Sequence, residues 1–117
     1  MDTVFVKDLR IDTIIGIYDH ERTTKQTIVL DFDMSFEIAK AAASEDINDA
    51  LNYKTLTDTL REFVEASEFL LIETLAERIA SMILNDFGVD KVKLTLHKPN
   101  ALSASTDVGV IIERSAK

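Results

Sequence analysis

The chain has 117 residues and carries 13 Lys and Arg against 21 Asp and Glu, which gives a formal charge of −8. This acidic balance argues against a nucleic-acid partner, because nucleic-acid binding requires clustered basic side chains. The absence of cysteine excludes disulfides and thiolate metal ligands, and it fits a reducing compartment. The length predicts one domain over residues 1–117 with a core of its own.

The sequence also argues against membrane association. No uncharged apolar stretch approaches the roughly 20 residues that a membrane-spanning helix requires. The opening residues, MDTVFVKDL, lack the basic segment followed by an apolar segment that marks a secretory signal. We therefore expect a cytoplasmic protein with no membrane partner.

Two strands are expected first along the chain. Apolar and polar side chains alternate regularly over residues 28–38, which is typical of an antiparallel strand with one buried face. Residues 4–17 are rich in β-branched side chains and are the expected hairpin partner. The polar connection over residues 18–26 is long for a tight turn, and such loops often carry function on a rigid scaffold.

The middle of the chain is expected to be helical. After the turn-rich stretch 43–51, a helix is predicted over 54–66 from the spacing of Leu56, Leu60, Phe63 and Val64. A second helix is predicted from Glu73 to Phe87, with Gly88 as its terminator.

Two more strands complete the chain, over residues 91–98 and 107–114, and residues 115–117 are expected to be a flexible tail. The order ββααββ predicts an α+β fold with a four-stranded antiparallel sheet and two helices on one face. Long strands leave sheet edges and one sheet face without cover, so we expect closed self-association.

Lys98 is the first candidate functional residue. It is in phase with the apolar residues Val92, Leu94 and Leu96, and side chains two apart in a strand share a face. Desolvation lowers the pKa of a lysine, and a lysine near neutrality can exchange protons with a substrate. The alternative is a lysine at the strand end that bends its stem into solvent.

Five segments occur in an order that resembles dihydroneopterin aldolase, the folate-pathway enzyme family of the tunnelling fold. They are GIYDHER (16–22), ALNYKTL (50–56), LLIETLAERIA (70–80), LHKPNAL (96–102) and VGVIIER (108–114). The resemblance covers almost the whole chain. It implies metal-independent, cofactor-independent retro-aldol cleavage of 7,8-dihydroneopterin into 6-hydroxymethyl-7,8-dihydropterin and glycolaldehyde, with epimerisation at C2′ as a side activity.

The resemblance also implies roles for particular residues. Glu73 would anchor the pterin through two parallel hydrogen bonds, and Ile72 would contribute its backbone. Lys98 would relay a proton from the 2′-hydroxyl, and Tyr53 of a neighbouring subunit would help to protonate C1′. Glu21 would contact the trihydroxypropyl side chain. Similar proteins form homo-octamers of two stacked tetrameric rings in which the sheets join into a barrel, and octamer and tetramer both remain open here.

Each of these residues also has a purely structural interpretation. Glu73 could be an exposed helix-start glutamate, Tyr53 an aromatic side chain at the start of the 54–66 helix, and Glu21 a solvated loop residue. A metal site built from His20, His97, Asp19 and Glu21 is disfavoured, because the two histidines lie far apart in sequence and show no ligand spacing.

Two other functions compete with the aldolase. The stretch SEDINDALNYKTL (44–56) is at least as similar to dihydroneopterin triphosphate 2′-epimerase. A triphosphate requires several cations near the pocket, and the nearby loops offer mainly Arg22, Lys25 and Lys54, which favours the aldolase. A non-catalytic oligomeric scaffold is the remote alternative, and it does not require Glu73 and Lys98 to share a pocket.

Overall fold

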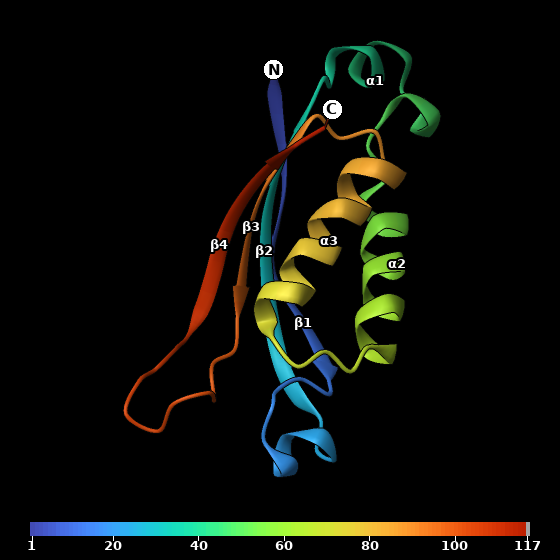
Figure 1. Cartoon of the computed structure of the whole chain (residues 1–117). Coiled ribbons are helices and arrows are strands. Elements are labelled where there is room, and N and C mark those ends of the chain that lie inside the picture. The colour runs from blue at the N-terminus through green and yellow to red at the C-terminus, as the bar shows by residue number, and fades with distance from the viewer. Residues whose placement is uncertain (117) are drawn as a thin grey trace.

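The structure is a computed structural model and describes residues 1–116. Four strands and three helices follow the order β1 (Asp2–Thr13), β2 (Gln26–Phe36), α1 (Ala39–Ser44), α2 (Tyr53–Ala66), α3 (Ile72–Asp86), β3 (Lys91–His97) and β4 (Gly109–Ser115) (Figure 1). Short 3-10 turns lie at Asp19–Arg22 and Ile47–Asp49. Among the described residues, no helix combines the length and apolar character needed to cross a membrane.

The strands form one antiparallel sheet in the order β1-β2-β3-β4, so the fold is α+β as expected. β2 pairs with β3, although a helical segment separates these two strands in the sequence. Phe32 of β2 lies between Val6 of β1 and Leu94 of β3, which sets the register at the centre of the core.

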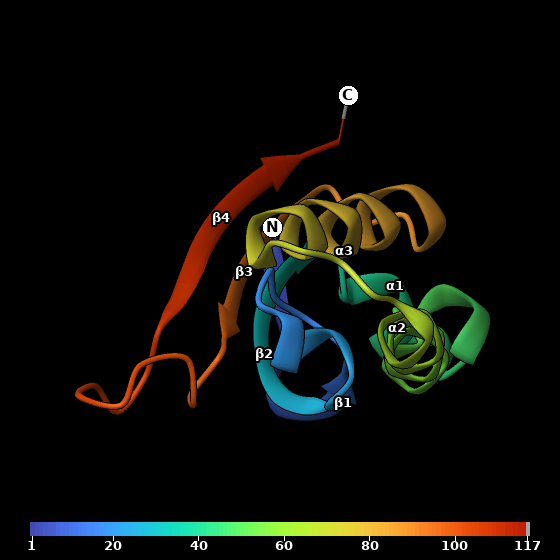
Figure 2. The same ribbon diagram turned by 60° about the horizontal axis from the view of Figure 1, so that its bottom comes forward.

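The long helices α2 and α3 cover the same face of the sheet (Figure 2). The alternation in β2 produces this face, because side chains two apart point the same way. Leucine and valine side chains of α2 and leucine, isoleucine and alanine side chains of α3 meet it at helical spacing. The fully buried residues include Ile28, Leu30, Phe32 and Met34 of β2, Leu56 and Leu60 of α2, and Leu75, Ile79 and Ile83 of α3.

Several element ends differ from the sequence-based expectations. β1 ends at Thr13, not at Ile17, because the chain turns there toward the segment after α2. The Thr13 hydroxyl donates to the Val64 carbonyl at 2.6 Å, and the Gly16 amide donates to the Phe69 carbonyl at 3.2 Å. These bonds bring residues 14–17 against the loop that leads into α3.

The other differences from the sequence-based expectations involve only a few residues each. β2 ends at Phe36, two residues before the expected end at Ile38, which caps the start of α1. The helix α1 itself lies in a region that was expected to be irregular. β4 extends to Ser115, and the Ala116 amide donates to the Asp90 carbonyl at 2.8 Å. Two residues of the expected tail are therefore hydrogen-bonded, and residue 117 lies outside the described residues.

Within residues 1–116, no helix covers the second face of the sheet. Phe5 of β1 and Ile111 of β4 are 66% and 64% exposed, although their strand neighbours pack into the core. They lie on the two outer strands of the sheet, with β2 and β3 between them. A bulge interrupts β1 between Val6 and Leu9, where Asp8 has a φ of 55°.

Candidate active site

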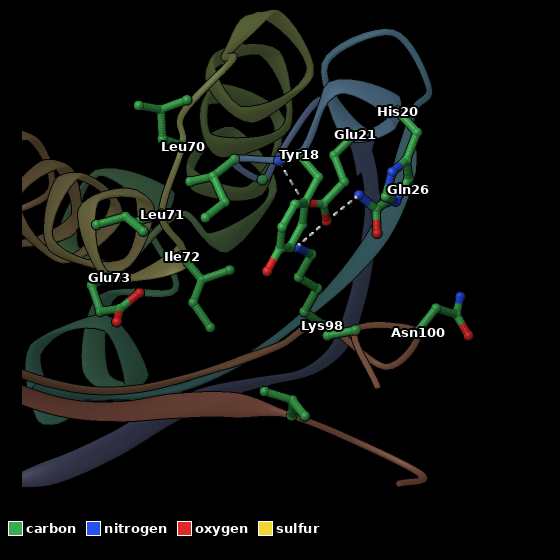
Figure 3. Close-up of a pocket in the computed structure, with 14 residues that line it drawn as sticks. Tyr18, His20, Glu21, Gln26, Leu70, Leu71, Ile72, Glu73, Lys98 and Asn100 are labelled. Carbon is green, nitrogen blue, oxygen red and sulfur yellow. Dashed lines mark hydrogen bonds and ion pairs between the residues drawn. The ribbon is translucent and has the colours of Figure 1, made fainter. Parts of the chain in front are cut away.

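A pocket of about 400 Å³ lies where the β1–β2 connection, the start of α3 and the end of β3 meet. A volume of this order is in the range of small-molecule sites. Among its lining residues are Glu21, Gln26, Ile72, Glu73, Lys98 and Asn100 (Figure 3). Four of the five residues proposed from the sequence thus line one pocket, namely Glu21, Ile72, Glu73 and Lys98.

Lys98 continues the buried row of β3 into this pocket. Its amide donates to the Val108 carbonyl at 2.6 Å, which holds the backbone just beyond the strand end. Its side chain is only 12% exposed, and Nζ donates to Oε2 of Glu21 at 2.7 Å. The ammonium therefore lies inside the pocket, and the alternative in which its stem bends into solvent is wrong.

Glu21 is buried in the 3-10 turn of the β1–β2 connection. The hydrogen bond from Lys98 lowers the pKa of its carboxyl from 4.5 to about 2, against the opposing effect of burial. Gln26 Nε2 donates to Oε2 at 3.1 Å and the Tyr18 amide donates to Oε1 at 3.3 Å, and both bonds favour the ionised form. Glu21 is therefore not the solvated loop residue of the structural alternative.

Two neighbouring residues make this turn possible. Gly16 has a φ of +131°, and a Cβ there would overlap the Glu21 carboxylate. Arg22 spans the gap to the segment before α3. Its Nη1 donates to the Gly16 and Phe69 carbonyls at 2.8 and 3.1 Å, and its Nη2 donates to the Glu68 carbonyl. The Arg22 guanidinium thus donates hydrogen bonds to three backbone carbonyls.

Glu73 lies on the opposite side of the pocket from the Lys98–Glu21 pair (Figure 3). It is in the first turn of α3, where the helix dipole favours a negative charge. Ile72, the first residue of α3, also lines the pocket. A carboxylate here can accept two parallel hydrogen bonds from a flat heterocycle, while the ammonium across the pocket can donate or relay a proton.

Tyr53 is not part of this pocket. It is the first residue of α2 and is 62% exposed, whereas the last residue of α2 leads toward the pocket. A helix of 14 residues is about 20 Å long, so one chain does not bring Tyr53 to Lys98. Its contribution from a neighbouring subunit stays a prediction.

Tyr18, Gln26 and Asn100 also line the pocket, and the sequence analysis does not predict them as site residues. Gln26 did carry a signal, because it is in phase with Ile28 and Leu30 and so belongs to the buried face of β2. A polar side chain in such a row needs a partner, and Gln26 Nε2 also donates to the Ile15 carbonyl at 2.9 Å. Nothing in the local sequence distinguishes Asn100 or Tyr18 from ordinary loop residues.

Fold and pocket together define a small α+β protein with a polar ligand site at one end of its sheet. The family model for dihydroneopterin aldolase matches residues 4–113. The chain belongs to the dihydroneopterin aldolase family.

Individual relatives agree with this assignment. The chain is 41% identical to dihydroneopterin aldolase of Escherichia coli K12 over 114 residues, which is 97% of this chain and 93% of the relative. It is 34% identical to dihydroneopterin triphosphate 2′-epimerase of the same organism, covering 92% of this chain and 89% of the relative. The crystal structure of E. coli dihydroneopterin aldolase in complex with neopterin superposes with a TM-score of 0.95 at 41% identity, over 98% of this chain and all of that one.

Proposed function

We propose that this chain is an aldolase that cleaves 7,8-dihydroneopterin into 6-hydroxymethyl-7,8-dihydropterin and glycolaldehyde, as part of folate biosynthesis. The observation that carries the proposal is the pocket that Glu73 and Lys98 line from opposite sides, in a chain of this family. The scaffold alternative requires no such convergence. A cytoplasmic location is part of the proposal, and cell fractionation tests it.

In this proposal Glu73 holds the pterin. Its carboxylate accepts hydrogen bonds from the 2-amino group and N3, and the Ile72 backbone lies beside it. Charge-assisted pairs of this kind are short and directional, so they fix the ring in one orientation. The trihydroxypropyl side chain then extends toward Glu21 and Lys98, which are 2.7 Å apart between Oε2 and Nζ.

The reaction divides into two proton transfers. Lys98 relays the proton of the 2′-hydroxyl, directly or through water, as the C1′–C2′ bond breaks and glycolaldehyde leaves. The bonding electrons move into the pterin, which serves as the electron sink. Tyr53 then helps to deliver a proton to C1′, which completes the hydroxymethyl product. If the intermediate adds back to the other face of the aldehyde carbonyl, the product is the C2′ epimer.

A site shared between subunits follows from the position of Tyr53. We propose that a closed homo-oligomer, a tetramer or an octamer with the sheets joined into a barrel, brings Tyr53 of one subunit to Lys98 of the next. In the described part of the chain β1 and β4 are the outer strands of the sheet, and an exposed strand edge can pair with another chain, which supports this assembly.

The triphosphate epimerase is the second candidate function. It would require cations that are free to bind phosphates, and two of the three that the sequence offered have other partners. The Arg22 guanidinium donates to backbone carbonyls, and Lys54 pairs with Asp58 at 2.6 Å. These contacts favour the unphosphorylated substrate.

One assay tests the proposal. The purified protein is incubated with 7,8-dihydroneopterin in EDTA, and glycolaldehyde is measured. We expect stoichiometric release of glycolaldehyde and 6-hydroxymethyl-7,8-dihydropterin. Absence of cleavage together with epimerisation of the triphosphate would replace the aldolase with the epimerase.

A further inference from the structure

His97 lies between two carboxylates on the face of the sheet that the helices leave uncovered. Its Nδ1 is 2.6 Å from Oδ2 of Asp107, and its Nε2 is 2.7 Å from Oδ2 of Asp31. The three residues line a hollow of about 230 Å³ that is separate from the active-site pocket. His97 is the residue before Lys98, and successive side chains in a strand point to opposite faces.

The two short contacts determine the protonation state of the ring. A neutral imidazole has a single N–H, so it can donate to only one carboxylate. Both contacts become hydrogen bonds when the ring is an imidazolium. Burial lowers the pKa of His97, but the hydrogen bonds to Asp107 and Asp31 outweigh it and raise that pKa above 6.5. Asp8 and Arg10 of β1 are the other charged residues that line the hollow, and the charge of Lys7 acts on Asp31.

These contacts form a continuous connection across the sheet. The Asp8 amide, at the β1 bulge, donates to Oδ1 of Asp31 at 2.7 Å. Asp31 belongs to β2, His97 ends β3, and Asp107 closes the loop that leads to β4. The loop over residues 98–108 is thus tied at both ends, since the Lys98 amide also donates to the Val108 carbonyl.

We propose that His97 is a positioning residue for Lys98. Its imidazolium ties β2 to the 98–108 loop, and this tie fixes the backbone from which the Lys98 side chain enters the pocket. Misplacement of a reacting group by about 1 Å can cost about 100-fold in rate, so a loosened loop lowers turnover without removing any group that touches the substrate. The inference deepens the aldolase proposal and rests on it for its kinetic part.

The first test does not depend on activity. Three variants are compared: Asp107→Asn and Asp31→Asn, which each remove one charge from the tie, and Asp33→Asn, which removes an exposed charge two residues along β2 on the same face. We expect faster hydrogen exchange of the Lys98 amide and a lower NMR pKa of His97 in the first two variants, and wild-type values in Asp33→Asn. The chain has only two histidines, so His97→Gln assigns the signal. Unchanged exchange in both tie variants would overturn the proposal.

The second test measures turnover against pH. Because the folded-state pKa of His97 is raised, the tie is complete at low pH and is lost as the pH rises through that pKa. We expect kcat of Asp107→Asn to fall several-fold, up to about 100-fold, with little change in KM, and its alkaline limb to move to lower pH by the NMR shift of His97. A profile identical to that of Asp33→Asn would contradict the proposal. A wild-type protein without aldolase activity would instead disprove the proposed function. The hydrogen-exchange experiment would still test whether the contacts of His97 hold the 98–108 loop.

Discussion

At the scale of single residues, the ion pair of Lys98 and Glu21 shapes one side of the pocket. Both side chains are nearly buried, at 12% and 10% exposure, and a buried charge is tolerated only when it is paired and hydrogen-bonded. Gln26 and the Tyr18 amide complete the partners of the carboxylate. Among the described residues, no buried side-chain nitrogen or oxygen lacks a hydrogen-bond partner. The Lys98–Glu21 side of the pocket is therefore held by hydrogen bonds before any ligand binds.

This pairing predicts a dependence of stability on acid. The pKa of Glu21 is about 2 in the folded chain against 4.5 for the free group, so folding favours the ionised form. The resulting stabilisation is complete above pH 4.5 and is lost as the pH falls toward about 2. Denaturant unfolding between these pH values should show a steeper loss of unfolding free energy in the wild type than in Glu21→Gln. Parallel curves would contradict the pairing.

A comparison of Gly16 with Gly88 distinguishes the effect of backbone strain from that of steric overlap in the pocket. Gly16 and Gly88 both have positive φ, at +131° and +66°, but only at Gly16 would a Cβ meet Glu21, while nothing lies within 4 Å at Gly88. We expect both alanine variants to lose more than about 1 kcal/mol of unfolding free energy. Only Gly16→Ala should also lose aldolase activity. Equal activity in the two folded variants would show that Glu21 does not need this close approach.

At the scale of elements, Arg22 connects the β1–β2 turn to the segment before α3 through the Glu68 and Phe69 carbonyls. The turn carries Glu21, and the segment leads into α3, which carries Glu73 on the opposite side of the pocket. Arg22→Met should lower the unfolding free energy by roughly 1–3 kcal/mol and raise KM, because the acceptors lose their donor and the two sides separate. Lys25→Met, an exposed change in the same connection, is the matched control. A KM in Arg22→Met equal to that of the control would refute the connection.

The elements could largely be predicted from the sequence because their periodicity is strong. The alternation in β2 and the helical spacing of Leu56, Leu60 and Val64 each specify a buried face, and the structure confirms both. The ends could not be predicted as well. β1 stops at Thr13 because Thr13 and Gly16 bond to residues more than fifty positions away, and local sequence carries no sign of such partners.

The pocket was predictable only in part. Strand phase placed Lys98 on the buried face but left open whether its stem bends into solvent, and the family resemblance supplied Glu21, Ile72 and Glu73. The ion pair between Lys98 and Glu21 was not foreseen, since it joins residues 77 positions apart. The contacts of His97 join β3 to β2 and to the 98–108 loop, and spacing in one strand cannot show them.

At the scale of the whole molecule, the separation of Tyr53 from the pocket predicts complementation between subunits. Tyr53→Phe and Lys98→Ala should each form inactive oligomers. If sites are shared, unfolding and refolding the two variants together should restore activity, because some sites combine an intact Lys98 with an intact Tyr53. Activity no higher than that of the separate variants, in mixed oligomers confirmed by mass spectrometry, would place both groups in one subunit or exclude Tyr53.

The most direct measurement compares Lys98→Ala with Glu73→Ala for both turnover and affinity for 6-hydroxymethyl-7,8-dihydropterin. Lys98→Ala should lower kcat by about 10²–10⁴-fold with little effect on affinity, because it removes a proton relay. Glu73→Ala should weaken pterin binding by about 10–100-fold, since it removes charge-assisted hydrogen bonds worth about 1.5–3 kcal/mol. Glu77→Ala, an exposed change one turn along α3, should alter neither property. Equal losses of affinity in the Lys98 and Glu73 variants, with turnover intact, would contradict the account.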